Sequence, residues 1–421
     1  MYEYLTNLIN RLYDLAYIER WNDHPKPFYI TELDKQAHKA VIAFILAKFE
    51  EERKLLSLDW DKLIRGLIFE AIQRSILTDI KPQVFHKIIK NNSVEVNNYV
   101  VGKIKKDRLG EDSGMEDFYG QFESYFTDKN TMVNEKMIIK ASHYLATYWE
   151  FQMIYSIAPN FYGIETIKQE IENELEDHSE LIGVERISRR ERTYNFVDLA
   201  GQLRFQKRWT QTPRIPMTSV LGHMFMVAVL SYIFSYKIEP KACPKRKYNN
   251  FFGALFHDLP EVTTRDIISP IKEGIPELKE TIKRYEKEQV EEKILPLLPE
   301  FLQEEFRYIT GFVDNAAIDE FSNRVKINDT VKAIESKELC QYNDDKYSPV
   351  DGKLIKACDW LCALTEALKS ISHGIKSAQL QSSINNLEEA LKDIGKTQLQ
   401  YINNNINFSD VIDKVKTEYE K

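Results

Sequence analysis

Apolar residues recur at intervals of three and four along most of this 421-residue chain. The spacing predicts amphipathic helices, which are clearest over residues 34–53, 219–236, 276–295 and 354–372. Strict alternation of apolar and polar residues, the pattern of half-buried strands, is nearly absent. The longest apolar run, residues 224–234, is far shorter than the roughly 18 residues that span a bilayer, so it predicts a buried helix. We therefore expect an all-α fold without a membrane span.

Three separated segments of the second half recur, in the same order, in the first half. Residues 195–209 match 7–21, residues 253–267 match 66–80, and residues 354–365 match 138–149. Collinear similarity at three points separated by loops of differing length indicates that one helical bundle is used twice. The length of the chain agrees, because chains beyond about 250–300 residues split into separate cores. The sequence thus predicts two tandem helical bundles.

The domain boundaries follow from the repeat and from the charge pattern. We expect a first bundle over residues 1–160, a connecting helix over 161–192, a second bundle over 193–375 and a helical tail over 376–421. The strongly charged connecting segment predicts a solvated helix, and a regulatory or docking segment is the alternative. The amphipathic tail is expected to pack across one of the repeats, or to serve oligomerisation.

Composition narrows the class of protein. Hydrophobic residues make up 43% of the chain against only 15 Gly and 14 Pro, which is typical of a globular protein with little linker. The formal net charge of −8 argues against a general nucleic-acid binder, although a local basic groove stays open. The amino terminus lacks the basic start and apolar stretch of a secretory signal, so we expect a cytoplasmic protein.

Charged residues distinguish the two copies. The second carries His257, Asp258, Glu261 and Asp359 where the first has Glu70, Ala71, Arg74 and His143. This difference indicates a catalytic second copy and a degenerate first copy. In the sequence comparison His38 takes the place of His223, so His38, Glu70 and His143 stay open as a residual metal site in the first copy.

A His followed directly by Asp, at positions 257 and 258, puts an imidazole beside a carboxylate, and both groups are good ligands for a divalent metal. His223 and Asp359 lie on two other apolar helices, where a lone polar residue is more often a satisfied core residue. A buried carboxylate is costly unless it is paired or bound to metal, so Asp359 needs a partner. A metal ion is the simplest one.

Three further residues have side chains suited to catalysis or to ligand binding. Glu261 follows His257 by four residues and faces the same side if the helix continues, with a surface carboxylate as the alternative. Arg208 supplies a planar fork for phosphate or base edges, and Trp209 supplies a flat apolar face for a sugar or ring. Because the first copy keeps this pair as Arg20 and Trp21, a purely structural role is the alternative.

The ordered set His223, His257-Asp258 and Asp359 resembles the H…HD…D signature of the HD superfamily of metal-dependent phosphohydrolases. With Arg208-Trp209, Glu261, Asp266 and Pro270-Ile271-Lys272 at near-identical spacing, residues 195–372 are similar to bacterial 5′-deoxynucleotidases of that superfamily. The resemblance implies one divalent metal, Mn, Co, Fe, Zn, Ni or Mg, with four ligands: His223, His257, Asp258 and Asp359.

The resemblance also implies roles for the neighbouring residues. Glu261 would act on the attacking water, Asp266 would lie beside the phosphate, and Arg208 with Trp209 would grip a nucleoside 5′-monophosphate. Lys272 would reach the phosphate, or else be a solvated loop lysine. Gly222 stands where those nucleotidases tend to have Glu, which leaves the sugar and base preference open.

Two other functions stay open beside phosphomonoester hydrolysis. One is hydrolysis of nucleoside triphosphates or cyclic nucleotides, because the superfamily shares its metal ligands. The other is nucleotide sensing without turnover, against which the complete ligand set and Glu261 argue. Single-repeat relatives generally work as dimers, which implies an intrachain pseudo-dimer here and leaves a homodimer open.

Overall fold

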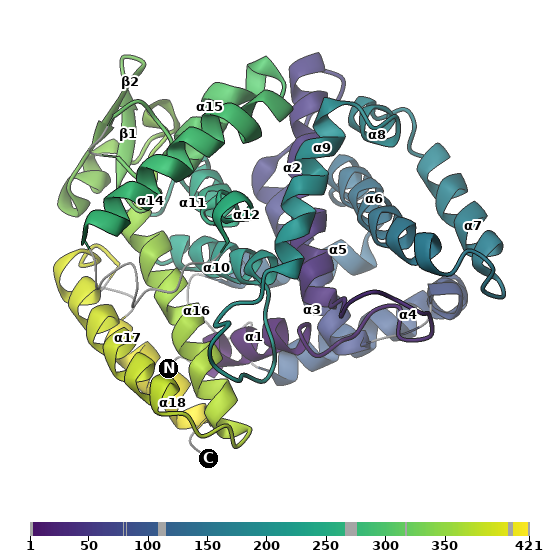
Figure 1. Ribbon diagram of the computed structural model, residues 1–421, viewed down its shortest axis with the longest axis horizontal. Coiled ribbons are helices and arrows are strands. Elements are labelled where there is room, and N and C mark those ends of the chain that lie inside the picture. Colours follow the sequence, from purple (N-terminus) through teal and green to yellow (C-terminus); the bar gives the residue numbers. More distant parts are fainter. Residues whose placement is uncertain are drawn as a thin grey trace. The chain divides into compact units, whose positions relative to one another are not determined.

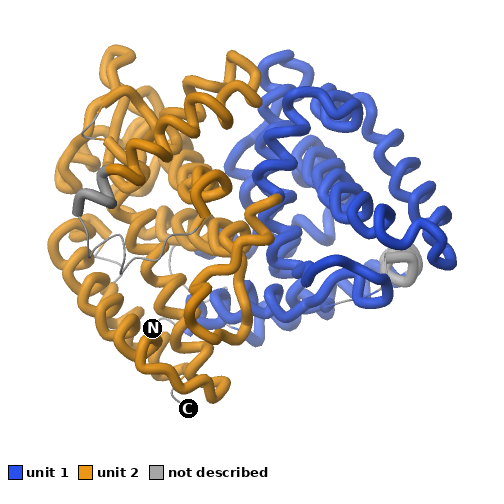
Figure 2. The backbone as a smooth tube through the Cα atoms, viewed as in Figure 1, with its two compact units in different colours: residues 1, 3–201 blue, residues 2, 202–421 orange. Residues whose placement is uncertain are grey.

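The computed structural model describes residues 3–78, 80, 82–107, 115–265, 276–315, 318–402 and 407–419. Helices make up nearly all of the regular structure of these residues (Figure 1), which confirms the all-α prediction. The chain divides into two compact units, Glu3–Gly201 (unit 1) and Gln202–Lys421 (unit 2), which are coloured separately in Figure 2. None of the described helices is both long and apolar enough to cross a membrane.

Unit 1 is built around a buried helix. Its helices are α1 (Glu3–Asp14), α2 (Glu32–Arg53), α3 (Trp60–Leu77), α4 (Pro82–Lys106), α5 (Glu116–Thr127), α6 (Val133–Ile157), α7 (Ile164–Glu176), α8 (Ile182–Ser188) and α9 (Arg192–Gln202). Helix α2 begins where the Thr31 side chain accepts a hydrogen bond from the backbone N–H of Asp34. It packs against α3, α6 and α8 and is buried from Glu32 to Glu50. The core of unit 1 therefore surrounds α2.

The charged segment before residue 193 has one buried side, although most of its residues are exposed or half-buried. It forms α7 and α8, which pack against α6 and α2. Ile164, Ile171 and Leu175 lie at spacings of seven and four, so they share one buried side of α7. The charged residues between them lie on the other side of the helix. Because they are so numerous, the composition of the segment does not indicate this narrow apolar stripe.

Unit 2 also surrounds one buried helix. Its elements are η1 (Leu203–Phe205), α10 (Val220–Ser235), α11 (Pro244–Phe256), α12 (Glu261–Thr264), α14 (Pro276–Gln289), η2 (Val290–Ile294), η3 (Leu295–Leu297), α15 (Glu300–Thr310), β1 (Arg324–Ile327), β2 (Thr330–Ala333), η4 (Ser336–Tyr342), η5 (Asp345–Tyr347), α16 (Gly352–Ser372), α17 (Ala378–Thr397) and α18 (Phe408–Tyr419). Every residue of α10 is buried, and α10 packs against α11 and α16. The small antiparallel sheet pairs Arg324 with Ala333.

A buried polar network ties α11 to the start of α16. The fully buried Arg246 donates from Nε to Oδ2 of Asp351 at 2.7 Å, and Asn250 donates to the same oxygen at 2.7 Å. The hydroxyl of Tyr401, beyond α17, donates to Oδ1 of Asp351 at 2.9 Å. Burial alone would raise the pKa of Asp351, but Arg246 outweighs it and the pKa lies below its ordinary value. This network fixes the N-terminal end of α16.

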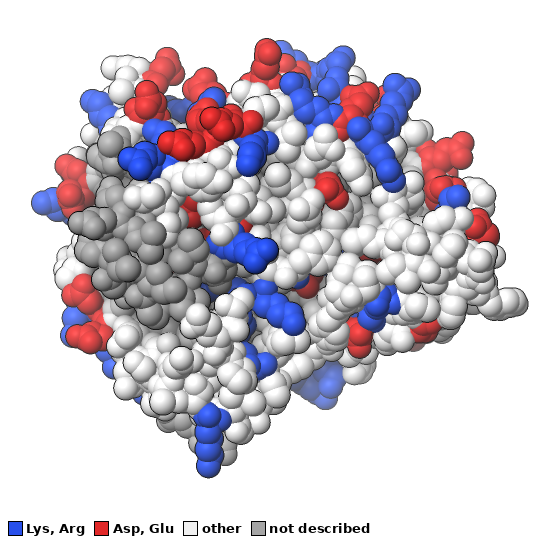
Figure 3. All heavy atoms as spheres, in the orientation of Figure 1, with Lys and Arg blue, Asp and Glu red and all other residues white. Residues whose placement is uncertain are grey.

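Acidic and basic side chains are interspersed on the face shown in Figure 3. Many pair locally, as Arg307 does with Glu291 at 2.7 Å. Exposed pairs of this kind contribute only about 0–1 kcal/mol each to stability. The stability of both units therefore depends on the buried helices α2 and α10 rather than on surface charge.

Candidate metal centre

Helix α10 carries His223 into the core of unit 2. Ser219 caps the helix by accepting a hydrogen bond from the backbone N–H of Gly222 at 2.9 Å, and His223 follows in the next turn. The His223 ring is fully buried, and its Nε2 lies 3.0 Å from Oδ1 of Asp359 on α16. Two helices far apart in the sequence thus bring an imidazole and a carboxylate into contact.

His257 follows the last residue of α11, and its orientation is fixed by the backbone. Its Nδ1 lies 2.7 Å from the carbonyl oxygen of Ala254, so in the neutral ring Nδ1 carries the proton and Nε2 has the lone pair. Nε2 is buried without a hydrogen bond, although it lies 3.1 Å from Oδ2 of Asp258. A buried lone pair beside a carboxylate is what a bound cation would satisfy.

His223, His257 and Asp359 form a cluster with metal-ligating geometry. Each offers one ligand atom, and these atoms all lie within 4.8 Å of one another. Two imidazoles and a carboxylate suit a divalent transition metal, and the orphaned Nε2 of His257 fits that use. The structure therefore brings together three of the four expected ligands, and Asp258, the fourth, lies directly beside His257.

Electrostatics keep both carboxylates of the site ionised. Burial alone would raise the pKa values of Asp258 and Asp359. His257 and His223 lower both, and Lys356, whose ammonium donates to Asp359 at 2.9 Å, lowers that of Asp359 further. Burial alone would lower the pKa of His257, but the two carboxylates raise it above its ordinary value. The site is built to attract a cation.

Glu261 lies at the start of α12, one turn after the His-Asp pair. The helix does not continue from α11 as expected, because residues 257–260 form a turn. The backbone N–H of Glu261 donates to the carbonyl oxygen of Asp258 at 3.0 Å, which ties the two residues together. Glu261 is only 6% exposed, so the alternative of a surface carboxylate is wrong.

Arg208 and Trp209 lie beside the same cluster. Nη1 of Arg208 is 3.7 Å from Oδ2 of Asp258, and its Nε is 3.5 Å from Oε2 of Glu366. The indole N–H of Trp209 donates to Glu366 at 2.9 Å. Trp209 has a positive φ of 59°, a backbone conformation that costs energy for a bulky residue and is common at functional sites.

Glu366 is the residue that the sequence analysis missed. It lies on α16 with a side chain only 1% exposed, where it accepts from Thr218 Oγ1 at 2.8 Å and pairs with Arg214 at 3.1 Å. Burial would raise the pKa of Glu366, but Arg214 and Arg208 outweigh it and lower the pKa. The available signal was its position seven residues after Asp359, two turns along the same side of an apolar helix.

Two predicted site residues, Asp266 and Lys272, lie outside the described residues. The residual metal site that the sequence left open in residues 1–160 is not formed among the described residues. The fully buried His38 lies 2.9 Å from the carbonyl oxygen of Val197 through its Nε2, and its ring packs edge-on against Trp149. Across the described part of unit 1, no three His, Cys, Asp or Glu side chains converge as those of unit 2 do. The hypothesis of a metal site at His38, Glu70 and His143 is wrong.

Comparison with known proteins shows what residues of unit 2 are similar to. Residues 200–388 match the family model described as HD domain. Residues 200–388 are thus similar to the HD domain family. The match confirms the resemblance carried by His223, His257-Asp258 and Asp359, and it covers the whole candidate centre.

Relatives of the HD domain include curated nucleotidases. The 5′-deoxynucleotidases of Yersinia pestis (strain Pestoides F) and Yersinia pseudotuberculosis (serotype O:3, strain YPIII) are each 24% identical over 181 residues. The match covers 41% of this chain and 72% of each relative. A crystal structure of an HD-domain phosphohydrolase from Listeria innocua covers 54% of this chain and 97% of its own, with 16% identity and a TM-score of 0.34.

Proposed function

We propose that the HD domain of unit 2 is a metal-dependent phosphohydrolase that releases phosphate from nucleoside 5′-monophosphates. The observation that carries the proposal is the position of Arg208 between Asp258 of the His-Asp pair and Glu366, which also holds Trp209. A group that binds phosphate and a group that binds a ring thus lie beside the candidate metal ligands. The names of the Yersinia relatives support the same substrate class.

His223, His257, Asp258 and Asp359 would hold the divalent metal, which supplies polarisation of the phosphoryl oxygen and acidification of water. Glu261, buried one turn from Asp258, takes a proton from the attacking water or returns one to the leaving oxygen.

The remaining residues orient the substrate. The Arg208 guanidinium donates to phosphate oxygens in a planar, charge-assisted arrangement. Trp209 presents its ring to the sugar or base while Glu366 fixes its indole N–H. Asp266 and Lys272, which follow Glu261 in the sequence, are proposed to lie beside the phosphate.

We further propose that unit 1 is a degenerate copy of the same bundle. An isolated β-bridge precedes each buried helix, Glu19 to Thr31 before α2 and Lys207 to Ser219 before α10. Trp21 has a φ of 55° where Trp209 has 59°. Trp21 donates to Glu150 at 3.0 Å, as Trp209 donates to Glu366 at 2.9 Å. These matched details support a common origin of the two backbones.

The test is a phosphate-release assay of the full chain, stripped of metal and then supplied with Mn, Co, Fe, Zn, Ni or Mg. The substrates are nucleoside mono-, di- and triphosphates and cyclic nucleotides. We expect release from monophosphates only in the presence of metal, and none from the His223→Ala variant. Release confined to triphosphates or cyclic nucleotides would overturn the substrate assignment. Nucleotide binding without any turnover would favour a sensor.

A further inference from the structure

The N-terminal turns of helices α2 and α10 show which residue of unit 1 takes the place of the candidate metal ligand His223. Thr31 caps α2 and Ser219 caps α10, and each is the second residue of its β-bridge. Counted from these caps, Lys35 in α2 occupies the position of His223 in α10. The sequence comparison paired His223 with His38 instead, which lies almost one turn too far along. A lysine therefore stands at the first metal-ligand position of unit 1.

The Lys35 ammonium lies inside the unit, against a histidine. Its Nζ is 3.0 Å from Nε2 and 3.1 Å from Nδ1 of His143, the residue that aligns with Asp359. Lys35 is only 1% exposed. The contact between His223 and Asp359 in unit 2 thus has a counterpart between Lys35 and His143 in unit 1.

Lys35 has more donors than its surroundings use. Among the described residues, its ammonium forms hydrogen bonds only with the His143 ring. A neutral imidazole offers one acceptor nitrogen, so Lys35 has at least one N–H group without an acceptor among the described residues, whether its amine is neutral or charged. Buried donors without acceptors are costly, and ligands commonly satisfy them at functional sites. The spare donors of Lys35 indicate a place for a group rich in oxygen.

Both cations and buried carboxylates act on Lys35, whereas the charged groups that act on His143 are cations. Burial lowers the pKa of Lys35, and so do Arg20 and Arg74, while Glu32 and Glu150 act in the opposite direction. Burial also lowers the pKa of His143, with Lys35, Lys39, Arg20 and Arg74 adding to the effect. An anion beside these two residues would relieve the repulsion among the cations.

Unit 1 keeps the side chains that accompany the phosphate site in unit 2. Arg20 donates to Glu150 at 2.9 Å and to Glu32 at 2.8 Å, and Trp21 donates to Glu150 at 3.0 Å. By contrast, Ala71 replaces a metal-ligating carboxylate and Arg74 replaces Glu261. Unit 1 therefore lacks the residues that are proposed to hold metal and transfer protons in unit 2, but it has the Arg-Trp pair.

We propose that unit 1 binds a phosphate-bearing anion without metal and without hydrolysing it, with Lys35 and Arg74 donating to the phosphate oxygens. Lysine supplies a compact charge and arginine a planar fork, the two common ways in which proteins bind phosphate. The phosphate half of the inference depends on unit 1 alone. The nucleoside half depends on the proposed function of unit 2, because Trp21 is the counterpart of Trp209.

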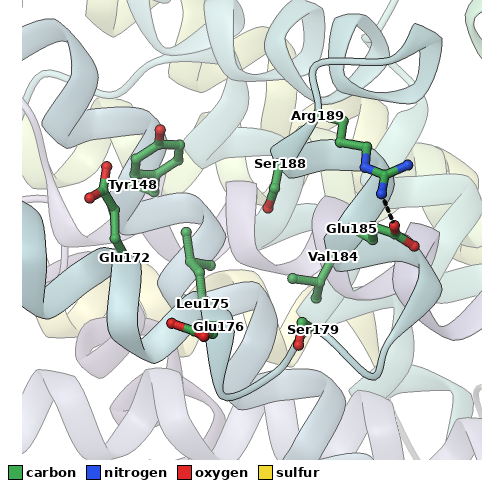
Figure 4. Close-up of a pocket in the computed structure, with 9 residues that line it drawn as sticks. All are labelled: Tyr148, Glu172, Leu175, Glu176, Ser179, Val184, Glu185, Ser188 and Arg189. Atoms are coloured by element: carbon green, nitrogen blue, oxygen red, sulfur yellow. Dashed lines mark ion pairs between the residues drawn. The ribbon is translucent and has the colours of Figure 1, made fainter.

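The hollow of unit 1 that is drawn in Figure 4 is unsuited to this ligand. Its volume is about 330 Å³, and Glu172, Glu176 and Glu185 contribute to its lining. Arg189, the one arginine drawn there, is paired with Glu185. Three carboxylates would repel a phosphate, so the Lys35 position is the better candidate.

The test uses the full chain with the Asp258→Ala change, in buffer with EDTA, so that unit 2 cannot take up metal. Calorimetric titration is run with inorganic phosphate and, separately, with a nucleoside 5′-monophosphate. We expect metal-free binding with one site per chain. Lys35→Met in this background should raise Kd by about tenfold or more, the usual loss on removing a charge-assisted hydrogen bond.

Lys48→Met is the matched control, because Lys48 lies on the same helix and pairs with Glu51 instead. It should leave Kd unchanged, and thermal melting establishes that each variant is folded. Absence of metal-free binding, or equal binding by folded Lys35→Met, would overturn the proposal. Equal affinity for phosphate and nucleotide would overturn its nucleoside half. Phosphate release by the unmodified chain with metal is measured separately, so failure here is distinct from failure of the proposed function.

Discussion

The indole N–H of Trp209 donates a 2.9 Å hydrogen bond to Glu366, a buried carboxylate two turns beyond Asp359 on the same helix. One helix, α16, therefore presents both a candidate metal ligand and the group that orients the candidate substrate pocket. Because Glu366 also lies 3.5 Å from Arg208, it couples the position of the guanidinium to that of the ring. We propose that Glu366 is a positioning residue.

Glu366→Gln should weaken substrate binding more than it affects metal binding. The amide keeps the shape but loses the charge that holds Arg208 and Arg214, so both arginines lose a buried partner. We expect KM for a nucleoside monophosphate to rise about tenfold or more, with metal content unchanged. Steady-state kinetics and metal analysis measure both. Glu388→Gln on α17, paired with Lys416 at 2.7 Å, is the control and should behave as the unmodified chain.

Glu261→Gln should retain metal and lose turnover. Glu261 is buried one turn from Asp258, where its carboxylate can exchange a proton with water or with the leaving oxygen. The amide cannot, so kcat should fall by about two to four orders of magnitude. Metal content per chain, measured on the same sample, separates this loss from loss of the metal. Near-normal kcat in the variant would exclude the proposed role.

Asp351 should make the stability of unit 2 sensitive to acid. Its pKa is lowered in the folded protein, so the ionised carboxylate stabilises the fold at pH values above the unfolded pKa of about 3.9. This contribution is lost progressively as the pH falls below that value toward the folded pKa. Asp351→Asn should cost about 3–5 kcal/mol at neutral pH, because it leaves the buried Arg246 without its counter-ion. Denaturant unfolding with EDTA measures both effects; a variant as stable as the parent would contradict them.

The sequence predicts the ligand cluster well because it depends on helix positions. His223 and Asp359 lie on helices with strong apolar periodicity, and His257 directly follows a third helix; the packing of these helices brings the three side chains together. Glu366 was not predicted from the sequence, because its proposed role depends on a tertiary contact with Trp209. No local sequence pattern indicates such a contact. The turn that begins at His257 was not predicted either. Helix α11 ends there without the glycine that commonly marks a helix end in the sequence.

If unit 1 is a degenerate copy of unit 2, as we propose, the pairing of His38 with His223 changes. An alignment guided by residue type selects His38 as the partner of His223, because both are histidines in apolar helices. The backbone bridges before α2 and α10 select Lys35 instead. These backbone hydrogen bonds align the two units without reference to side-chain identity. A single sequence does not contain this information.

The chain should bind one divalent metal, and His223 should be essential for it. His223→Ala removes a fully buried imidazole whose Nε2 faces Asp359, so metal and phosphate release should both be lost. His38→Ala is the matched control, because it also removes a fully buried imidazole, one whose Nε2 lies against the carbonyl oxygen of Val197 instead. A folded His38→Ala variant should keep one metal per chain and near-normal release, although loss of packing will lower its melting temperature. Metal analysis, activity and thermal melting are measured on both variants. Loss of metal from a folded His38→Ala variant, or retention by His223→Ala, would assign the metal to residues other than those of unit 2.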